Sequence, residues 1–205
     1  MFYGCSFEQI EFDHPIEVIG DDAFGFCTSL KEISIPEGVK NLENYCFRWC
    51  TSLKKVVLPD TLEKIGWNVF SKCSSLEEII IPNGVKFIWN NSFAGCTSLK
   101  TVKILADLNA VGGGTFSGCS SLETVVLPKK LQMIAENSFM NCSLLERIEI
   151  PESVGNIIGS HAFWGCENLS EIKIPEGVER LGNYCFGNCT SLKTIVFSKR
   201  LAEIG

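Results

Sequence analysis

Residues 47–59 read Phe-Arg-Trp-Cys-Thr-Ser-Leu-Lys-Lys-Val-Val-Leu-Pro, and variants of this phrase recur along the chain. Each copy centres on a cysteine that has a phenylalanine three residues before it. The anchor cysteines are Cys5, Cys27, Cys50, Cys73, Cys96, Cys119, Cys142, Cys166 and Cys189. Their spacing is 23 residues in six intervals, 22 in one and 24 in one. A fixed period between about 20 and 29 residues is typical of solenoids that form one coil per repeat. The repeat therefore predicts the architecture of the chain.

The second repeat shows how each coil is expected to fold. Leu30, Ile33 and Ile35 have the spacing of an inner strand, and the two-residue period points both isoleucines inward. Pro36 is expected to end this strand because it has no N–H for a parallel ladder. The outer segment is too short for a full helix. We therefore expect extended or 3₁₀ structure there, and a solenoid of shallow curvature.

The repeat as a whole, F-x-x-C-x-S-L-x-x-I-x-I-P-x-x-V-x-x-I-G-x-x-A-F, resembles the BspA-like class of leucine-rich repeats over essentially the whole chain. The resemblance implies a β-rich solenoid, a right-handed leucine-rich-repeat superhelix with a parallel inner β-sheet. It also implies a non-catalytic recognition surface, of a kind common on cell-surface or secreted proteins that bind host or matrix proteins. It brings no catalytic residues. Departures are local, such as Leu105 and Ser198 at the proline position.

The domain organisation follows from the continuity of the repeat. We expect residues 1–205 to form a single leucine-rich-repeat domain of eight to nine repeats, since no linker interrupts them. Neither end has the polar face of a solenoid cap. The expectation is a segment of a longer protein, or ends that stack on a partner. The first residues show no signal peptide, so the compartment stays open beyond what the resemblance suggests.

Composition and motifs exclude several functional classes. The net charge of −6 and the pI near 5.1 argue against a nucleic-acid binder. No apolar run approaches the roughly eighteen residues that a membrane span needs. The chain has neither G-x-S-x-G, H-E-x-x-H nor a phosphate-binding loop, and its two histidines, His14 and His161, lie in different repeats. We expect no enzymatic activity and no cofactor.

The eleven cysteines raise the alternatives of metal, disulfide or core. The closely spaced pairs Cys46/Cys50 and Cys185/Cys189 lie six repeats apart, about 30 Å at the spacing of neighbouring strands, so they cannot share a metal. The anchor cysteines should stack with parallel side chains, which is poor disulfide geometry. We therefore expect a reduced, buried ladder and no metal site. A serine replacing Cys96 would have no guaranteed hydrogen-bond partner in such a slot.

Two surface groups are candidate protein-binding sites. Val57 and Ile80 are adjacent outward apolar residues of inner strands, although strand propensity explains them equally well. The second group consists of aromatic residues at variable positions of repeats two to four, where other repeats mostly have Gly, Asn, Ser, Lys or Glu. These residues are Phe26, Tyr45, Trp49, Trp67, Phe87 and Trp89. Clustered surface aromatics are typical of protein or carbohydrate contact sites. A structural role as cover for the core remains the alternative, above all for Trp89, which replaces a loop glycine.

Two hypotheses for the function follow. The first is a non-catalytic protein-recognition or adhesion module that presents a solenoid surface to a protein partner, such as a host or matrix protein. In the aromatic group, Phe26, Trp49, Trp67 and Trp89 would then line one edge of the solenoid. The alternative is a structural or assembly protein whose open repeat ends stack end to end or on another subunit.

Overall fold

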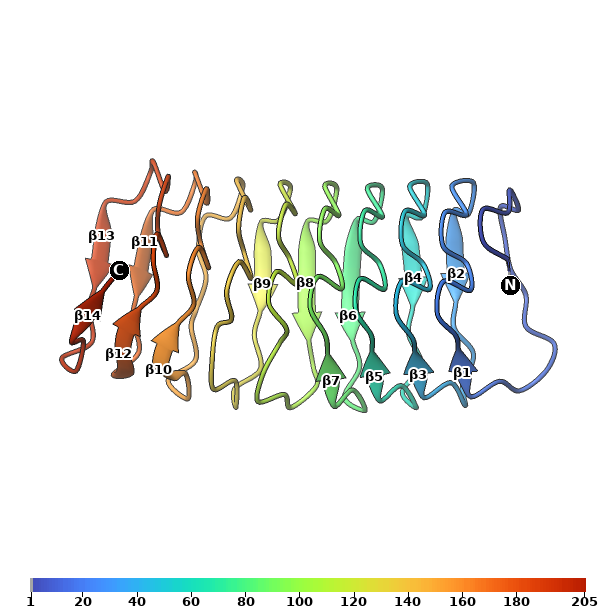
Figure 1. The fold of residues 1–205 in the computed structure, drawn as a ribbon, viewed down its shortest axis with the longest axis horizontal. Helices are drawn as coiled ribbons and strands as arrows, with labels where there is room; N and C mark the ends of the chain where they lie inside the picture. Colours follow the sequence, from blue (N-terminus) through green and yellow to red (C-terminus); the bar gives the residue numbers. More distant parts are fainter. Residues whose placement is uncertain (1) are drawn as a thin grey trace.

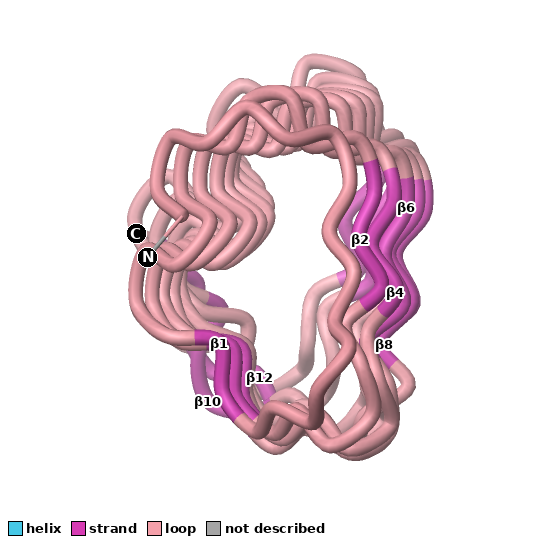
Figure 2. The backbone as a smooth tube through the Cα atoms, turned by 90° about the vertical axis from the view of Figure 1, so that its right-hand side faces the viewer, coloured by secondary structure: helices cyan, strands magenta, loops and turns pink. Residues whose placement is uncertain are grey.

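The computed structural model describes residues 2–205 as a solenoid of about eight coils. The coils stack side by side along one axis, and the two ends of the chain lie at opposite ends of the stack (Figure 1). The stack is nearly straight, in agreement with the predicted shallow curvature. Seen along the axis, the strands form two groups on different sides of the coil, joined by turns and loops, and the strands of each group follow one another from coil to coil (Figure 2). The predicted fold class is confirmed.

The inner wall is formed by the segments that follow the anchor cysteines. Its strands are β2 (Glu32–Ser34), β4 (Lys55–Val57), β6 (Glu78–Ile81), β8 (Thr101–Ile104), β9 (Thr124–Val126), β11 (Glu171–Lys173) and β13 (Thr194–Val196). All their pairings are parallel, and Ile33 lies opposite Val56 while Ile79 lies opposite Val102. Exposed and buried residues alternate along β2, β4 and β6. This alternation follows from the two-residue period of a strand, which places every second side chain in the core.

The outer wall is built from the shorter extended segments that return the chain. Its strands are β1 (Val18–Ile19), β3 (Asn41–Leu42), β5 (Lys64–Ile65), β7 (Phe87–Ile88), β10 (Gly155–Ile158), β12 (Gly177–Leu181) and β14 (Glu203–Ile204). They form two parallel sheets, β1-β3-β5-β7 and β10-β12-β14. Between β7 and β10 the only bridge of this wall within residues 2–205 joins Ile134 to Ile158. The ladder of the outer wall is thus interrupted in its middle.

A column of phenylalanines runs through the core. From Phe24 to Phe186 the rings of neighbouring coils stack almost in parallel, with centroids 5.3 to 5.7 Å apart. Each of these rings begins a tight turn that ends at the anchor cysteine. In the third repeat, for example, the Cys50 N–H donates to the Phe47 carbonyl at 3.3 Å. The repeated Phe-x-x-Cys phrase therefore forms one corner of every coil.

The anchor cysteines form a second column, and their thiols have defined partners. Eight of them donate to the carbonyl of the phenylalanine that begins the corner of the preceding coil. Cys96 Sγ, for instance, lies 3.1 Å from the Phe70 carbonyl oxygen and Cys119 Sγ lies 3.2 Å from that of Phe93. The expectation that a serine at position 96 would lack a partner was wrong, because this carbonyl is available to a hydroxyl. Only the structure shows it, since the acceptor belongs to the backbone of another coil.

The burial of the cysteine column predicts its reactivity. Nine of the eleven cysteines are buried and all are free thiols, whereas Cys5 and Cys189 are partly exposed. We expect a water-soluble disulfide reagent to modify only Cys5 and Cys189 in the native protein, and the buried nine only after unfolding. Thiolate is the reactive form, and burial in apolar surroundings suppresses it. Mass spectrometry of the native and denatured protein measures this. Fast native labelling of Cys73 or Cys96 would contradict the buried ladder.

Candidate functional site

The residue before each anchor cysteine adopts a left-handed backbone conformation. Its φ is positive in all nine repeats, from Gly4 at 71° to Asn188 at 56°. Gly or Asn occupies six of these positions, while Phe26, Trp49 and Lys72 occupy the other three. A left-handed conformation costs an ordinary L-residue about 1–2 kcal/mol, and Gly avoids this cost. The rings of Phe26 and Trp49 are thus held at positions where they strain the backbone.

The first aromatic group lies at this corner, and we call it the corner cluster. It consists of Tyr3, Phe26, Tyr45 and Trp49 with the cations Arg48 and Lys72. The ring of Phe26 lies between that of Tyr3, 5.2 Å away, and that of Trp49, 5.9 Å away. Trp49 is 43% exposed, and Phe26 and Tyr45 are half-buried. The cluster is therefore a ring stack on the surface of the first three coils, with one broad face open to solvent.

Two cations lie against these rings. The Arg48 guanidinium lies 5.1 Å from the Phe26 ring centroid and 5.0 Å from that of Tyr45, and its Nε donates to Asp22 at 2.7 Å. The Lys72 ammonium lies 6.0 Å from the Trp49 centroid. Cations over aromatic faces contribute about 0.5–1 kcal/mol at exposed sites. These contacts stabilise the observed arrangement of the rings.

The second aromatic group lies on the outer wall, and we call it the outer-wall cluster. It consists of Trp67, Phe87 and Trp89, whose side chains are 48%, 57% and 42% exposed. Trp67 meets Trp89 edge to face at 6.0 Å, and Phe87 stacks on Trp89 at 6.4 Å. No ring contact joins this cluster to the corner cluster in the part of the chain described. The structure thus brings the six predicted aromatics together as two groups on neighbouring coils, rather than as one continuous edge.

The apolar pair of the inner wall is smaller. Val57 and Ile80 are 46% and 48% exposed, and both point outward as predicted. In the ladder Val57 lies opposite Ser34, and Ile80 lies opposite Lys103. A polar and a charged residue therefore bound the pair, and Lys103 separates it from Val126. The aromatic clusters offer the larger apolar surface.

Sequence reasoning missed three members of the corner cluster, Tyr3, Arg48 and Lys72. Tyr3 lies in the irregular first repeat, and Arg48 and Lys72 resemble ordinary solvated charges. Aligning the repeats by the residue before the anchor cysteine would have placed Lys72 directly after Phe26 and Trp49 in one column. The contacts of Arg48 with three different rings depend on side-chain direction, which the alignment does not give.

The structure of residues 2–205 also bears on metal binding, thiol reactivity and membrane spans. No three side chains of the His, Cys, Asp and Glu types converge there as a metal site would require. Burial raises the pKa of Cys27 to about 11 and that of Cys119 to about 12, so these thiols are protonated at neutral pH. Nor does any helix in this range have the length and apolar character needed to cross a membrane.

Comparison with known proteins identifies the family of the repeat. The family model of the BspA type leucine rich repeat region matches residues 1–123 and 109–205. The chain belongs to this family. BspA-type leucine-rich repeats are generally non-enzymatic repeat proteins. No curated protein is significantly similar to the chain.

Several solved structures of leucine-rich repeat proteins are similar to this solenoid. A leucine-rich repeat protein from Bacteroides ovatus is 30% identical with a TM-score of 0.71, and the match covers 96% of this chain and 57% of that one. The T. pallidum leucine-rich repeat protein is 32% identical with a TM-score of 0.69, over 79% of this chain and 75% of that one. A leucine-rich cell surface protein from Faecalibacterium prausnitzii is 26% identical with a TM-score of 0.58, over 96% and 75%. The chain thus spans little more than half the length of the Bacteroides ovatus protein.

Proposed function

We propose that this BspA-type solenoid is a non-catalytic recognition or adhesion module that binds a protein partner through its exposed aromatic clusters. Leucine-rich-repeat domains commonly bind proteins. A similar protein from Faecalibacterium prausnitzii is described as a cell surface protein, which supports a role in adhesion. The alternative assembly role predicts oligomers whose mass grows with concentration, and a sedimentation experiment separates the two.

One observation carries the proposal: two large aromatic residues, the half-buried Phe26 and the 43% exposed Trp49, occupy a backbone position that favours glycine. Strained conformations of this kind persist where the surrounding structure holds them, and they concentrate at functional sites. Phe26 and Trp49 add nothing to the phenylalanine column of the core, which is complete without them. Ordered aromatic side chains also lose little conformational entropy on binding, and Trp and Tyr are enriched in the energetic centres of interfaces.

The repeat itself supplies a mild test variant. Trp49→Gly introduces the residue that Gly95 and Gly118 provide in the same column, and Trp67→Asn introduces the equivalent of Asn44 and Asn90. We expect the double variant to lose capture of the partner from extracts of the native environment. The free energy of unfolding should change by no more than about 1 kcal/mol, because relief of the strain at position 49 offsets the lost ring contacts. Quantitative pull-down and denaturant titration measure the two effects.

The matched control changes the other candidate surface. Val57→Thr with Ile80→Thr keeps β-branched side chains on the inner wall and removes its exposed apolar pair. Capture by this control should equal that of the unchanged protein. If the control loses the partner and the Trp49/Trp67 variant retains it, the binding site lies on the inner wall and the aromatic proposal is wrong.

A further inference from the structure

A groove with a volume of about 600 Å³ crosses the outer wall where its ladder is interrupted. Its lining includes the rings of Phe87 and Trp89, the side chain of Met133, and the small residues Ala110, Gly112 and Gly113 of the coil between them. Pockets that accept small ligands or anchoring side chains generally measure about 300–1,000 Å³. The groove therefore has room for one or two side chains of a partner.

The sequence makes this groove by changing one column of the repeat. In the outer wall, Lys64 pairs with Phe87, and Ile157 pairs with Arg180. The positions between these two pairs, at the same place in each coil, are Ala110 and Met133. This column therefore has four consecutive apolar residues, Phe87, Ala110, Met133 and Ile157, with a charged residue at either end. Ala110 is the smallest of the four, so it leaves a depression between its larger neighbours.

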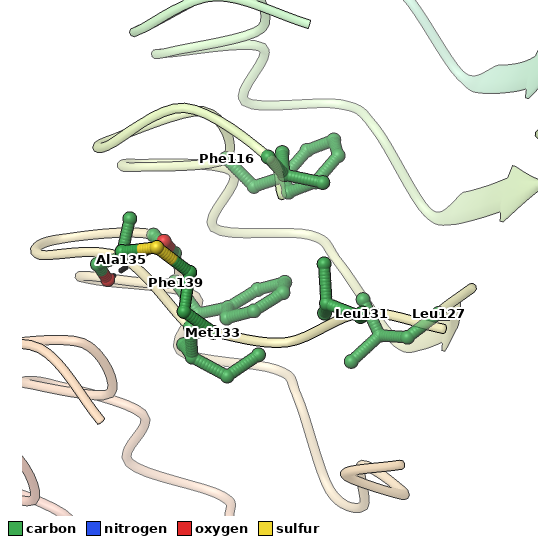
Figure 3. Close-up of a pocket in the computed structure, with 9 residues that line it drawn as sticks. Phe116, Leu127, Leu131, Met133, Ala135 and Phe139 are labelled. Atoms are coloured by element: carbon green, nitrogen blue, oxygen red, sulfur yellow. Dashed lines mark hydrogen bonds between the residues drawn. The ribbon is translucent and has the colours of Figure 1, made fainter. Parts of the chain in front are cut away.

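A small cavity lies beneath the groove. A cavity of about 10 Å³ lies inside the solenoid next to Phe116 and Phe139 (Figure 3). Met133, Val111 and Ala135 line both this cavity and the groove. The cavity is too small and too apolar to hold a ligand. Met133 is 41% exposed, and methionine adapts readily to the shape of what it contacts.

The charged groups around the groove indicate which kind of side chain it suits. Glu136 is the only charged residue that lines it, and no ion pair or side-chain hydrogen bond engages this carboxylate among the described residues. The nearby lysines Lys86 and Lys130 are paired with Glu63 and Asp107. The faces of the aromatic rings are also electron-rich. The groove thus combines one carboxylate that has no side-chain partner among residues 2–205 with apolar walls.

We propose that the outer-wall groove binds a basic side chain, arginine or lysine, that a protein partner presents next to an apolar residue. The cation contacts the faces of Phe87 and Trp89 and pairs with Glu136, while the apolar neighbour fills the depression over Ala110 against Met133. Glu136 lies two coils from Trp89, about 10 Å at the strand spacing. A guanidinium over the intervening coil, at Gly112 and Gly113, is about 5 Å from each, within reach of both a ring face and the carboxylate. This inference rests on the proposed recognition function and specifies the partner's chemistry.

A sugar is the competing occupant, since aromatic faces also bind pyranose rings. Its hydroxyl groups need several directed polar partners, and unpaired ones lower affinity. Besides Glu136, the polar side chains of the groove are Asn90 and Ser160. The side-chain oxygen Oδ1 of Asn90 already accepts a hydrogen bond from the Gly113 N–H at 3.2 Å. The groove therefore suits a single cation better than a sugar.

Short peptides test the inference directly. The probes are acetyl-Leu-Arg-Leu-amide, the same peptide with citrulline, a neutral isostere of arginine, and the same peptide with glutamate. Methyl glucoside is the sugar probe. Binding is followed by NMR through the Trp89 indole N–H and the Met133 methyl group. We expect the arginine peptide to shift both signals with millimolar affinity, and citrulline to bind about two- to five-fold more weakly, as for an exposed charge pair. Glutamate should bind least, and added salt should narrow the differences.

Substitutions in the groove test which residues contact the arginine peptide. Glu136→Gln should lower the affinity of the arginine peptide to that of the citrulline peptide, whereas the matched control Glu149→Gln, on the inner wall, should leave it unchanged. Trp89→Gly restores the residue found at Gly66 and Gly159, so it should remove binding and keep the fold. Equal affinity for all three peptides, a response to methyl glucoside alone, or no response to any probe would each overturn the inference. The proposed recognition function would survive these results if Trp49→Gly with Trp67→Asn still abolished capture of the partner.

Discussion

Replacing Phe93 by Ala is expected to lower the free energy of unfolding by about 3–5 kcal/mol, the usual cost of truncating a buried phenylalanine. The Phe93 side chain is fully buried, and its ring stacks at 5.4 Å on Phe70 and at 5.7 Å on Phe116. The change therefore leaves a cavity that two neighbouring coils border. In a solenoid each coil contacts only its neighbours, so both interfaces weaken together. Denaturant titration followed by circular dichroism measures the loss.

The same substitution at Phe2 provides the control. Phe2 is 54% exposed and stacks on a single member of the column, Phe24, at 5.5 Å. Phe2→Ala should therefore cost about 1 kcal/mol, since much of its apolar area is already in water. Phe93→Leu, which keeps most of the volume, should cost less than Phe93→Ala. Equal losses for Phe93→Ala and Phe2→Ala would contradict a core stacked coil on coil.

Alkaline pH is expected to unfold the protein through its buried thiols. Burial, the largest cause in each case, raises the pKa of nine cysteines above the ordinary value, to about 12 for Cys119 and Cys185 and to about 11 for Cys27 and Cys189. The others are Cys46, Cys73, Cys96, Cys142 and Cys166. In the unfolded chain thiols ionise near pH 8.5–9, at about their ordinary pKa. At pH values between the ordinary pKa and the raised pKa, the folded state binds more protons than the unfolded state. The free energy of unfolding therefore falls as pH rises.

The size of this effect follows from the number of thiols. Each contributes up to about 1.4 kcal/mol per pH unit once the unfolded chain ionises. The eight that are buried, all but Cys189, together contribute up to about 11 kcal/mol per pH unit, comparable with the typical stability of a domain, about 5–15 kcal/mol. We expect the thiol contribution to the free energy of unfolding to be independent of pH below about pH 8, and the protein to unfold near pH 10. Circular dichroism across a pH series under reductant, with proton release measured by titration, tests this.

A conservative double variant isolates the thiols from the lysines and tyrosines that also titrate in this range. Cys46→Ala with Cys185→Ala introduces the residue that the same position carries at Ala23 and Ala162. It should reduce the slope of stability against pH by up to about 2.7 kcal/mol per unit and lower proton release on unfolding by two protons. An unchanged slope would show that other groups drive alkaline unfolding.

Much of the candidate site follows from the repeat, and part of it does not. Aligning the coils identifies Phe26, Trp49, Trp67 and Trp89 as departures from Gly and Asn, and the structure places all of them at the surface or half-buried. The stacking of Phe26 on Trp49 follows from their shared column, whereas the pairing of Trp89 with Trp67 and Phe87 joins different columns and does not. That second grouping depends on side-chain direction on the outer wall.

The sequence by itself determined the coil, its period, the phenylalanine column and the burial of the cysteines. Equivalent residues of a solenoid contact each other in successive coils, so one repeat specifies the packing of the next. Only the tertiary structure determined the features that depend on the backbone path or on contacts between residues of different columns. It set the thiol hydrogen bonds to carbonyls of the preceding coil, the left-handed backbone beneath Phe26 and Trp49, and the groove over Ala110. These features depend on the path of the backbone and on the space that neighbouring side chains leave, and a one-dimensional pattern of residue types does not contain them.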